Sequence, residues 1–208
     1  MRDERQERNQ SVRARATLRS ATTWCRRFGI LCLVLVATTI ASLAQTFTTL
    51  VSFDGNNGQN PAYASLAQGL DGNLFGTTEF GGANGSGTVF EITPTGTLNS
   101  LFSFDCTGAC PEQPLAGLAL GTDGSFYGTS QSAPIDYGTV FKISSSGALE
   151  ILHSFSGGDG SFPNDAPIQG SDGNFYGTTA TGGVNGYGTV FKITPAGVLS
   201  TIHNFERN

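Results

Sequence analysis

Residues 172–179 read DGNFYGTT and residues 188–193 read GTVFKI, and this pair of motifs decides the fold because it occurs three times. The first motif begins at Asp71, Asp123 and Asp172, and the second begins at Gly87, Gly138 and Gly188. A hydrophobic run that ends in phenylalanine recurs beside them, as LVSF at 50–53, LFSF at 101–104, LHSF at 152–155 and IHNF at 202–205. Steps of about fifty residues indicate a repeat architecture.

Each copy predicts four short strands, because apolar, β-branched and aromatic runs alternate with turn residues and helix signals are absent. In the second copy the first two strands are GLALG (117–121) and SFYGTS (125–130), and the Asp-Gly between them is suited to the positive φ angles of a type I′ turn. A loop then leads to the third strand, and a Thr-Pro-x-Gly turn, or Ser-Ser-Gly in the second copy, leads to the fourth. A glycine follows the aromatic residue of every second strand, which indicates a bulge or a close approach.

Four antiparallel strands per repeat, with one long connection between repeats, predict an all-β, β-propeller-like array of four-stranded blades. The rival is a stacked β-solenoid, whose repeats are usually shorter and form parallel rungs. The repeat domain is expected at 45–208, with units at 50–100, 101–151 and 152–205.

Three blades are fewer than the four to eight that usually close a propeller, so the array is expected to be an open arc. The run at 48–53 is then a surplus strand of the fourth type. Exposed apolar end faces predict a homo-oligomer that completes the array, with a truncated reading frame as the other explanation.

The N-terminal part differs sharply from the repeats. Residues 1–27 hold eight of the eleven basic residues, and the next seventeen residues, 28–44, are uncharged and end in Ser-Leu-Ala. This pattern predicts a signal peptide, 1–44, cleaved between Ala44 and Gln45, or else an uncleaved N-terminal anchor. The protein is therefore expected to be secreted, in the periplasm or outside the cell, without membrane attachment after cleavage.

The remaining chain carries three basic and 13 acidic side chains, a net charge of −10. Such a domain repels nucleic acid and anionic lipid, so neither is expected as a partner. Export and solubility by themselves favour a negative surface, and an acidic binding role is the other interpretation.

Two of the four cysteines, Cys106 and Cys110, lie in the mature chain within the sequence CTGAC. An oxidising compartment allows them to form a disulfide. The alternative, a structural zinc site, needs four ligands, and no histidine lies near these cysteines.

No cofactor-binding or catalytic constellation stands in the sequence, so no cofactor is expected. Asp71, Asp123 and Asp172 lie in hairpin turns, where aspartate favours the local backbone geometry. His153 and His203 share a slot that earlier copies fill with Val51 and Phe102, which favours a packing role, and neither has an evident aspartate partner. Calcium near Asp54, or near Asp159 and Asp165, stays open, although EF-hand spacing is absent.

The candidate recognition surface is the loop between the second and third strands. Its copies contain Phe80, Tyr137 and Tyr187 among Gly, Asn and Asp. Exposed aromatic rings stack on sugar faces, so this is the possible ligand-facing loop. The competing interpretation is that the tyrosines pack at the entrance of the third strand.

The unit LxxLhSF, DGNFYGTT, GYGTVFKITPxG over residues 50–205 resembles the choice-of-anchor tandem repeat called GloVer. The resemblance implies a secreted bacterial repeat protein without a known activity, while surface attachment is in doubt because no sorting anchor follows. A more distant similarity, in architecture only, is to virginiamycin B lyase-type propellers. We therefore expect a secreted non-enzymatic module that binds itself, a glycan or an envelope protein; a secreted propeller enzyme acting on polysaccharide or a small polar substrate is the alternative.

Overall fold

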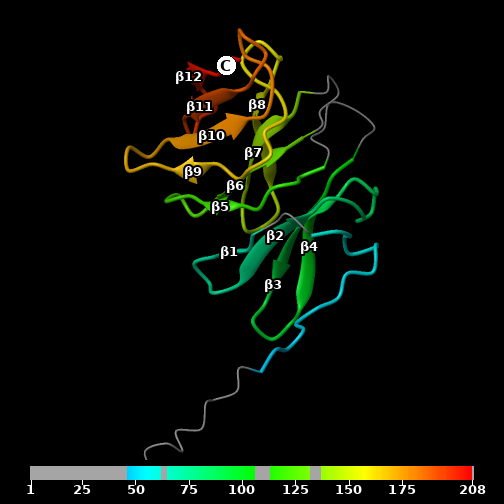
Figure 1. Ribbon diagram of the computed structural model, residues 1–208. Coiled ribbons are helices and arrows are strands. Elements are labelled where there is room, and N and C mark those ends of the chain that lie inside the picture. The colour runs from blue at the N-terminus through cyan, green and yellow to red at the C-terminus, as the bar shows by residue number, and fades with distance from the viewer. Residues whose placement is uncertain (1–45, 62–64, 106–112, 132–136, 208) are drawn as a thin grey trace, which may run out of the picture. The chain divides into compact units, whose positions relative to one another are not determined.

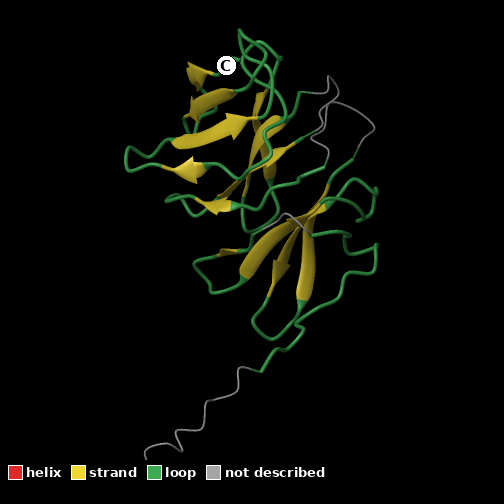
Figure 2. Cartoon of the chain, viewed as in Figure 1, coloured by secondary structure: helices red, strands yellow, loops and turns green. Residues whose placement is uncertain are grey.

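Twelve strands and no helix are found in the part of the chain that the computed structural model describes, residues 46–61, 65–105, 113–131 and 137–207 (Figure 2). Among these residues there is no helix with the length and hydropathy needed to cross a membrane. Residues 49–208 form one unit, and the description that follows concerns that unit.

The strands form three four-stranded antiparallel sheets, each made from consecutive strands (Figure 1). The first sheet contains β1 (Ala67–Gln68), β2 (Leu74–Thr78), β3 (Thr88–Ile92) and β4 (Leu98–Ser103). The second contains β5 (Ala119–Leu120), β6 (Phe126–Ser130), β7 (Thr139–Ile143) and β8 (Leu149–Ser154). The third contains β9 (Ile168–Gln169), β10 (Phe175–Thr179), β11 (Thr189–Ile193) and β12 (Leu199–Asn204).

This topology confirms the all-β, propeller-like fold, since each sheet is made of four consecutive antiparallel strands and no parallel rungs link successive sheets within the described residues. The sheets and the sequence repeats are offset. The sequence-based boundary at 100/101 falls inside β4, because the fourth strand pairs with the three strands before it.

The turn between the first two strands of each sheet is not the predicted type I′ turn. In the first sheet the Gly72 N–H donates to the Gly69 carbonyl and the Gly69 N–H donates to the Asn73 carbonyl. Gly72 has a φ of +86°, whereas Asp71 is not among the residues with positive φ. This pattern is a three-residue loop, a type I turn followed by a glycine in a bulge. The Asp-Gly dipeptide was assigned to the wrong turn because both turns need a glycine at the same point.

Aspartate stabilises this turn through its side chain. Asp71 Oδ1 accepts a hydrogen bond from the Asn73 N–H at 3.1 Å, Asp123 does the same with Ser125 at 3.1 Å, and Asp172 with Asn174 at 3.2 Å. The structural role expected for these three carboxylates is therefore present in all three sheets.

Each fourth strand carries a β-bulge. The register shifts between Val89 and Phe90 opposite β4, and the same shift occurs in the other two sheets. One extra residue in each fourth strand is thereby left unpaired, Leu101, Leu152 or Ile202. The carbonyls of Leu101 and Leu152 lie against Gly147 and Gly197 in the next sheet, so the bulge joins successive sheets.

Two hydrophobic cores hold the sheets together, one between each pair of neighbours. The first contains Phe75, Val89 and Phe104 of the first sheet and Leu118, Phe126, Phe141 and Ile143 from the second. The second core has Tyr127, Val140 and Phe155 facing Phe175, Phe191 and Ile193. Rings stack across both joints, Phe75 on Phe126 at 4.1 Å and Tyr127 on Phe175 at 3.8 Å between centroids.

The strand glycines confirm the expected close approach. A Cβ on Gly128 would lie 2.5 Å from Cζ of Phe141, and a Cβ on Gly177 would lie 2.5 Å from Cζ of Phe191. The phenylalanine of the third strand therefore fills the space beside the glycine of the second.

The surplus fourth strand expected at 48–53 is not a strand in the structure, because these residues have no strand partner among the described residues. They still occupy the position that the fourth strand of a preceding sheet has at the internal joints. Phe53 packs edge-on against Phe90 at 5.1 Å, as Phe104 packs against Phe141 at 5.7 Å and Phe155 against Phe191 at 5.3 Å.

Candidate functional site

The loop between the second and third strands is fixed by the connection that enters its sheet. In the third sheet Ser161 and Thr181 exchange two backbone hydrogen bonds, of 2.8 and 3.1 Å, and the Gly183 N–H donates to the Gly157 carbonyl at 2.8 Å. The Val184 N–H donates to Oδ1 of Asn204 at 3.0 Å. The loop at 180–188 is therefore held from both sides and presents a preformed surface.

The three predicted aromatic residues lie in separate loops, each between the second and third strands of its own sheet. None of their rings contacts another of the three within the described residues. They are 37%, 38% and 48% exposed, in the order Phe80, Tyr137 and Tyr187. Phe80 does not occupy the tyrosine slot, since it forms a bridge with Gln59 in the way that Thr181 does with Ser161.

Tyr137 serves the joint between the second and third sheets. Its carbonyl accepts a hydrogen bond from the Phe162 N–H at 2.9 Å, and its ring lies against Gly157, where a Cβ would be 3.0 Å from it. Both contacts favour the packing interpretation for this residue.

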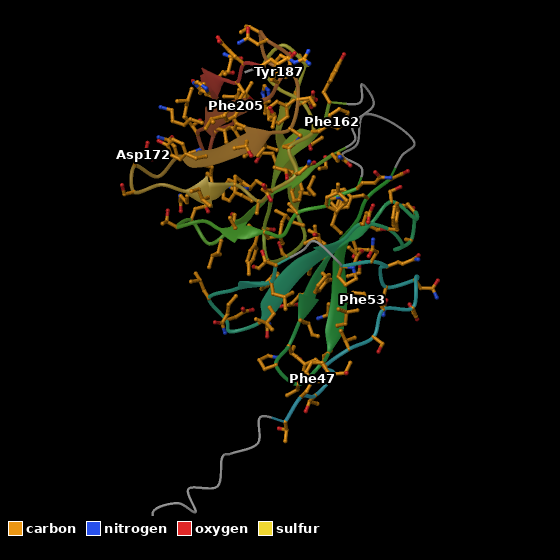
Figure 3. All side chains as sticks on the ribbon, viewed as in Figure 1. Phe47, Phe53, Phe162, Asp172, Tyr187 and Phe205 are labelled. Carbon is orange, nitrogen blue, oxygen red and sulfur yellow. The ribbon has the colours of Figure 1, made fainter. Side chains whose placement is uncertain are left out.

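Tyr187, which Figure 3 labels, is the most exposed of the three aromatics by its exposed fraction. The same loop carries Val184, whose side chain is 79% exposed. Sequence reasoning missed Val184, because its place in the first copy is taken by Ala83 and the comparison of copies gave it no weight.

His153 of β8 pairs with an aspartate of the connection that follows the strand, which corrects the expectation that neither histidine has an aspartate partner. His153 Nε2 lies 2.8 Å from Oδ2 of Asp159. The backbone N–H and the hydroxyl of Ser156 both donate to Oδ1 of the same carboxylate, at 2.8 and 2.9 Å. The pair was missed because only the fold of the GGDG turn brings residue 159 back to residue 153.

The protonation state of Asp159 follows from these contacts. Burial raises its pKa, but the hydrogen bonds from Ser156 and from His153 outweigh burial and hold the pKa below its ordinary value. The Ser156 hydroxyl is bonded to the carboxylate and not to the imidazole, so the three side chains are not arranged as a nucleophile, a base and an orienting acid.

The packing role expected for the histidine slot is also present. His153 packs edge-on against Phe155 at 5.1 Å, His203 against Phe205 at 5.0 Å, and Phe102 against Phe104 at 5.1 Å.

A second polar cluster, at the opposite end of the second sheet, was not predicted. Oδ2 of Asp123 accepts from the Tyr127 hydroxyl at 2.9 Å and lies 2.9 Å from Nζ of Lys142. Burial raises the Asp123 pKa, yet the hydrogen bonds from Lys142, Ser125 and Tyr127 bring it below the ordinary value. The bond to Asp123 raises the pKa of Lys142. Burial, and then the hydrogen bond from its own hydroxyl to Asp123, raise the pKa of Tyr127.

This cluster varies from copy to copy. In the third sheet the Tyr176 hydroxyl donates to Asp172 at 2.8 Å, and hydrogen bonds from Asn174 and Tyr176 lower the pKa of that carboxyl. In the first sheet Phe75 has no hydroxyl, and Asn73 links Asp71 to Glu91 instead. The shared element is the turn aspartate, which indicates a structural cluster.

A small cavity of about 130 Å³ lies between the first and second sheets, beside the turns that join the first two strands of each sheet. Its walls include Leu70, Phe75 and Phe126, with Asp71 and Ser145 as the polar groups. Ligand pockets are typically about 300–1,000 Å³, so this cavity is small for anything but a fragment of a ligand.

The structure does not assemble the calcium ligands considered from the sequence. Within the described ranges, no group of three or more His, Cys, Asp or Glu side chains is placed to hold a metal ion. Asp54 accepts from the backbone N–H groups of Asn56 and Asn57 and so shapes its own turn. Cys106 and Cys110, and the cleavage residues Ala44 and Gln45, lie outside the described residues.

Comparison of the sequence with known families identifies a repeat protein. The family model described as the Gloeobacter/Verrucomicrobia repeat matches twice, over residues 37–133 and 107–208. No curated protein matches the sequence.

Three solved structures that the chain is similar to have low sequence identity to it. One is virginiamycin B lyase from Staphylococcus aureus, with 17% identity, a TM-score of 0.47, and 70% of this chain and 41% of the lyase covered. A putative gluconolactonase has 14% identity, a TM-score of 0.47 and coverages of 66% and 47%. A luciferin-regenerating enzyme has 16% identity, a TM-score of 0.42 and coverages of 66% and 45%. The chain spans less than half the length of each of them.

Proposed function

The chain belongs to the Gloeobacter/Verrucomicrobia repeat family, and we propose that it acts as a secreted, non-enzymatic module that binds carbohydrate through the loop at 180–188. The observation that supports this most directly is the combination of a fixed loop backbone with exposed Tyr187 and Val184 side chains. A rigid loop that already presents an aromatic ring loses little conformational entropy when a ligand binds.

The chemistry of the loop fits a sugar. An exposed tyrosine offers an apolar face for the C–H groups of a pyranose ring, and its hydroxyl, with Asn185 nearby in sequence, offers hydrogen bonds. The net charge of −10 on residues 45–208 disfavours strongly anionic polymers. We therefore expect a neutral glycan as the ligand.

A glycan array tests this proposal, with Tyr187→Ala and Tyr187→Phe as a matched pair. Loss of one stacked ring is expected to weaken binding at least about tenfold in Tyr187→Ala, while Tyr187→Phe keeps the ring and most of the affinity. Binding that is unchanged in Tyr187→Ala, or no glycan bound by the wild-type protein, would contradict the proposal.

Secretion rests on the N-terminal sequence pattern and has its own test. Protein recovered from the exported fraction is expected to have an intact mass that begins at or near Gln45. A mass that retains residues 1–44 would contradict cleavage at this site.

The second candidate is a secreted enzyme that acts on polysaccharide or a small polar substrate, and the observation that favours it is the His153–Asp159 pair. A carboxylate bonded to one ring nitrogen orients an imidazole for proton transfer at the other. Turnover of polysaccharide that His153→Asn abolishes, with folding unchanged, would support the enzyme; turnover that survives the substitution would exclude this pair as its site.

A further inference from the structure

One face of the third sheet carries residues that the other two sheets use to bind their successors. We call it the trailing face, made of Tyr176, Thr178, Val190, Ile202 and Phe205. Phe205 is 42% exposed and Ile202 is 55% exposed, whereas Phe104 and Phe155, which correspond to Phe205, are fully buried. Thr178 is exposed, whereas Thr77 and Thr129 are buried.

The joints inside the chain show what this face is built to contact. The Thr77 hydroxyl donates to the Ala116 carbonyl at 2.7 Å, and the Thr129 hydroxyl donates to the Asp165 carbonyl at 3.1 Å, each across a joint. The ring corresponding to Tyr176 stacks on the next sheet in both joints, at 4.1 and 3.8 Å. The same interface therefore forms twice within the chain. The trailing face has the residues for one side of a further interface of this kind.

The complementary half is the face of the first sheet formed by Leu66, Leu74, Phe90 and Ile92, which we call the leading face. Leu66 is 52% exposed, whereas its counterpart Leu118, which a preceding sheet covers, is 5% exposed. The leading face is thus open in part.

Residues 50–53 cover the rest of the leading face as a substitute for a preceding fourth strand. Phe53 packs on Phe90 at 5.1 Å, and the carbonyl of Leu50 lies against Gly96 as that of Leu101 lies against Gly147. By alignment of LVSF with IHNF, Leu50 and Phe53 correspond to Ile202 and Phe205. Figure 3 labels Phe53 and Phe205, the two equivalent rings.

A backbone donor in the first sheet and a backbone acceptor in the third sheet correspond to the donor and acceptor that are hydrogen-bonded at each internal joint. At the two internal joints the Gln113 N–H donates to the Ser86 carbonyl at 3.3 Å, and the Phe162 N–H donates to the Tyr137 carbonyl at 2.9 Å. The corresponding donor in the first sheet is the Asn60 N–H, and the corresponding acceptor in the third sheet is the Tyr187 carbonyl. Neither has a backbone partner among the described residues.

We propose that copies of this chain assemble head to tail, with the trailing face of one copy docked on the leading face of the next. Residues 202–205 of one copy take the place of residues 50–53 in the other, which are displaced. Such an interface is heterologous, so repeated docking gives a closed ring if the rotation closes and a filament if it does not. The argument for this assembly does not rest on carbohydrate binding. At each joint between copies, Tyr187 would take the place that Tyr137 has at the internal joint, so carbohydrate would bind at Tyr187 only where the trailing face is free.

A complementation experiment tests the proposal with two single variants of exposed residues. Phe205→Asp blocks only the trailing face, and Leu66→Lys blocks only the leading face. In analytical ultracentrifugation the wild-type protein is expected to show a mean mass that rises with concentration, and each variant alone is expected to stay monomeric. Their equimolar mixture is expected to form dimers, because each variant supplies the face that the other lacks.

A third variant tests the competing segment. Leu50→Ser/Phe53→Ser weakens the intramolecular cover, so half-maximal association is expected at a concentration at least about tenfold lower than for the wild type. Circular dichroism on every variant checks that the sheets are intact. A wild type and a Leu50→Ser/Phe53→Ser variant that both stay monomeric, or a mixture of folded Phe205→Asp and Leu66→Lys that forms no dimer, would overturn the proposal.

Discussion

At the scale of single residues, all three copies keep a glycine in the second strand where a side chain would collide with the phenylalanine of the third strand. The aromatic ring of each third strand occupies the volume that a Cβ would need at the glycine of the second strand. This explains why Gly76, Gly128 and Gly177 follow the aromatic position in every copy, and it assigns them to packing and not to ligand binding.

Gly128→Ala is expected to destabilise the protein by about 1–3 kcal/mol, because the new methyl group would meet Phe141 at 2.5 Å in a fully buried site. Denaturant unfolding measures the change. Gly158→Ala is the matched control, since a Cβ there has nothing within 4 Å and the φ of Gly158 is not positive. Equal effects of the two substitutions would contradict the packing explanation.

The Asp159 carboxylate makes stability depend on pH at the acid end. Its pKa in the folded protein lies below the value of about 3.9 for an unfolded chain, so its contribution is present above about pH 4 and is lost as pH falls through the folded pKa. Asp159→Asn is expected to lower the free energy of unfolding by about 1 kcal/mol at pH 7, with a difference that shrinks toward pH 2.

Unfolding midpoints between pH 2 and pH 7 measure this dependence. Asp165→Asn serves as the control, because the Asp165 side chain is exposed and only its backbone carbonyl takes part in a joint. A constant difference between the wild type and Asp159→Asn over the whole range would argue against the carboxylate as the titrating group.

At the scale of elements, the sequence predicted the four strands of each repeat, their order and the position of each turn, because period-two patterns and turn residues act locally. The turn type was wrong because Asp-Gly is compatible with two loops, and only the backbone hydrogen bonds of Gly69 distinguish them. The β-bulge at Leu101 was also missed, since one extra residue leaves no mark in a hydrophobic run. The His153–Asp159 contact depends on a turn whose shape the sequence does not show.

The hydroxyl that links neighbouring sheets gives a test at this scale. Thr129→Val removes a buried hydrogen bond to the Asp165 carbonyl and leaves that carbonyl without this donor, so a loss of about 1–2 kcal/mol is expected. Thr178→Val occupies the same slot on the exposed trailing face and is expected to change stability by less than about 0.5 kcal/mol. Thermal unfolding of dilute monomer compares the two variants. Equal losses of stability would mean that the hydrogen bond across the joint does not stabilise the array.

At the scale of the whole molecule, the sequence predicted the repeat array and its open ends, since counting motifs is enough to count sheets. It did not predict how the ends are treated. The substitute role of residues 50–53 arises from packing on Phe90 and not from strand pairing, so a sequence pattern for strands could not show it. The loop aromatics could be ranked only in the structure: Tyr187 is exposed in a fixed loop, whereas Tyr137 packs at a joint, and a role of Tyr187 in ligand binding stays a prediction.

An array in which each sheet contacts only its neighbours predicts a gradient of local stability. The second sheet is covered on both faces, and every residue of β6 is buried, whereas the middle three residues of β10 are half-buried or exposed. Hydrogen exchange of dilute monomer is expected to be slowest in β6 and β7 and at least about tenfold faster in β10 and β11, because the third sheet loses fewer contacts when it opens. Higher protein concentration is expected to slow exchange in β10 and β11 and to leave β6 unchanged if the trailing face becomes covered. Uniform protection across all three sheets at every concentration would instead mean that the array unfolds as one cooperative unit whose end face has no influence on local opening.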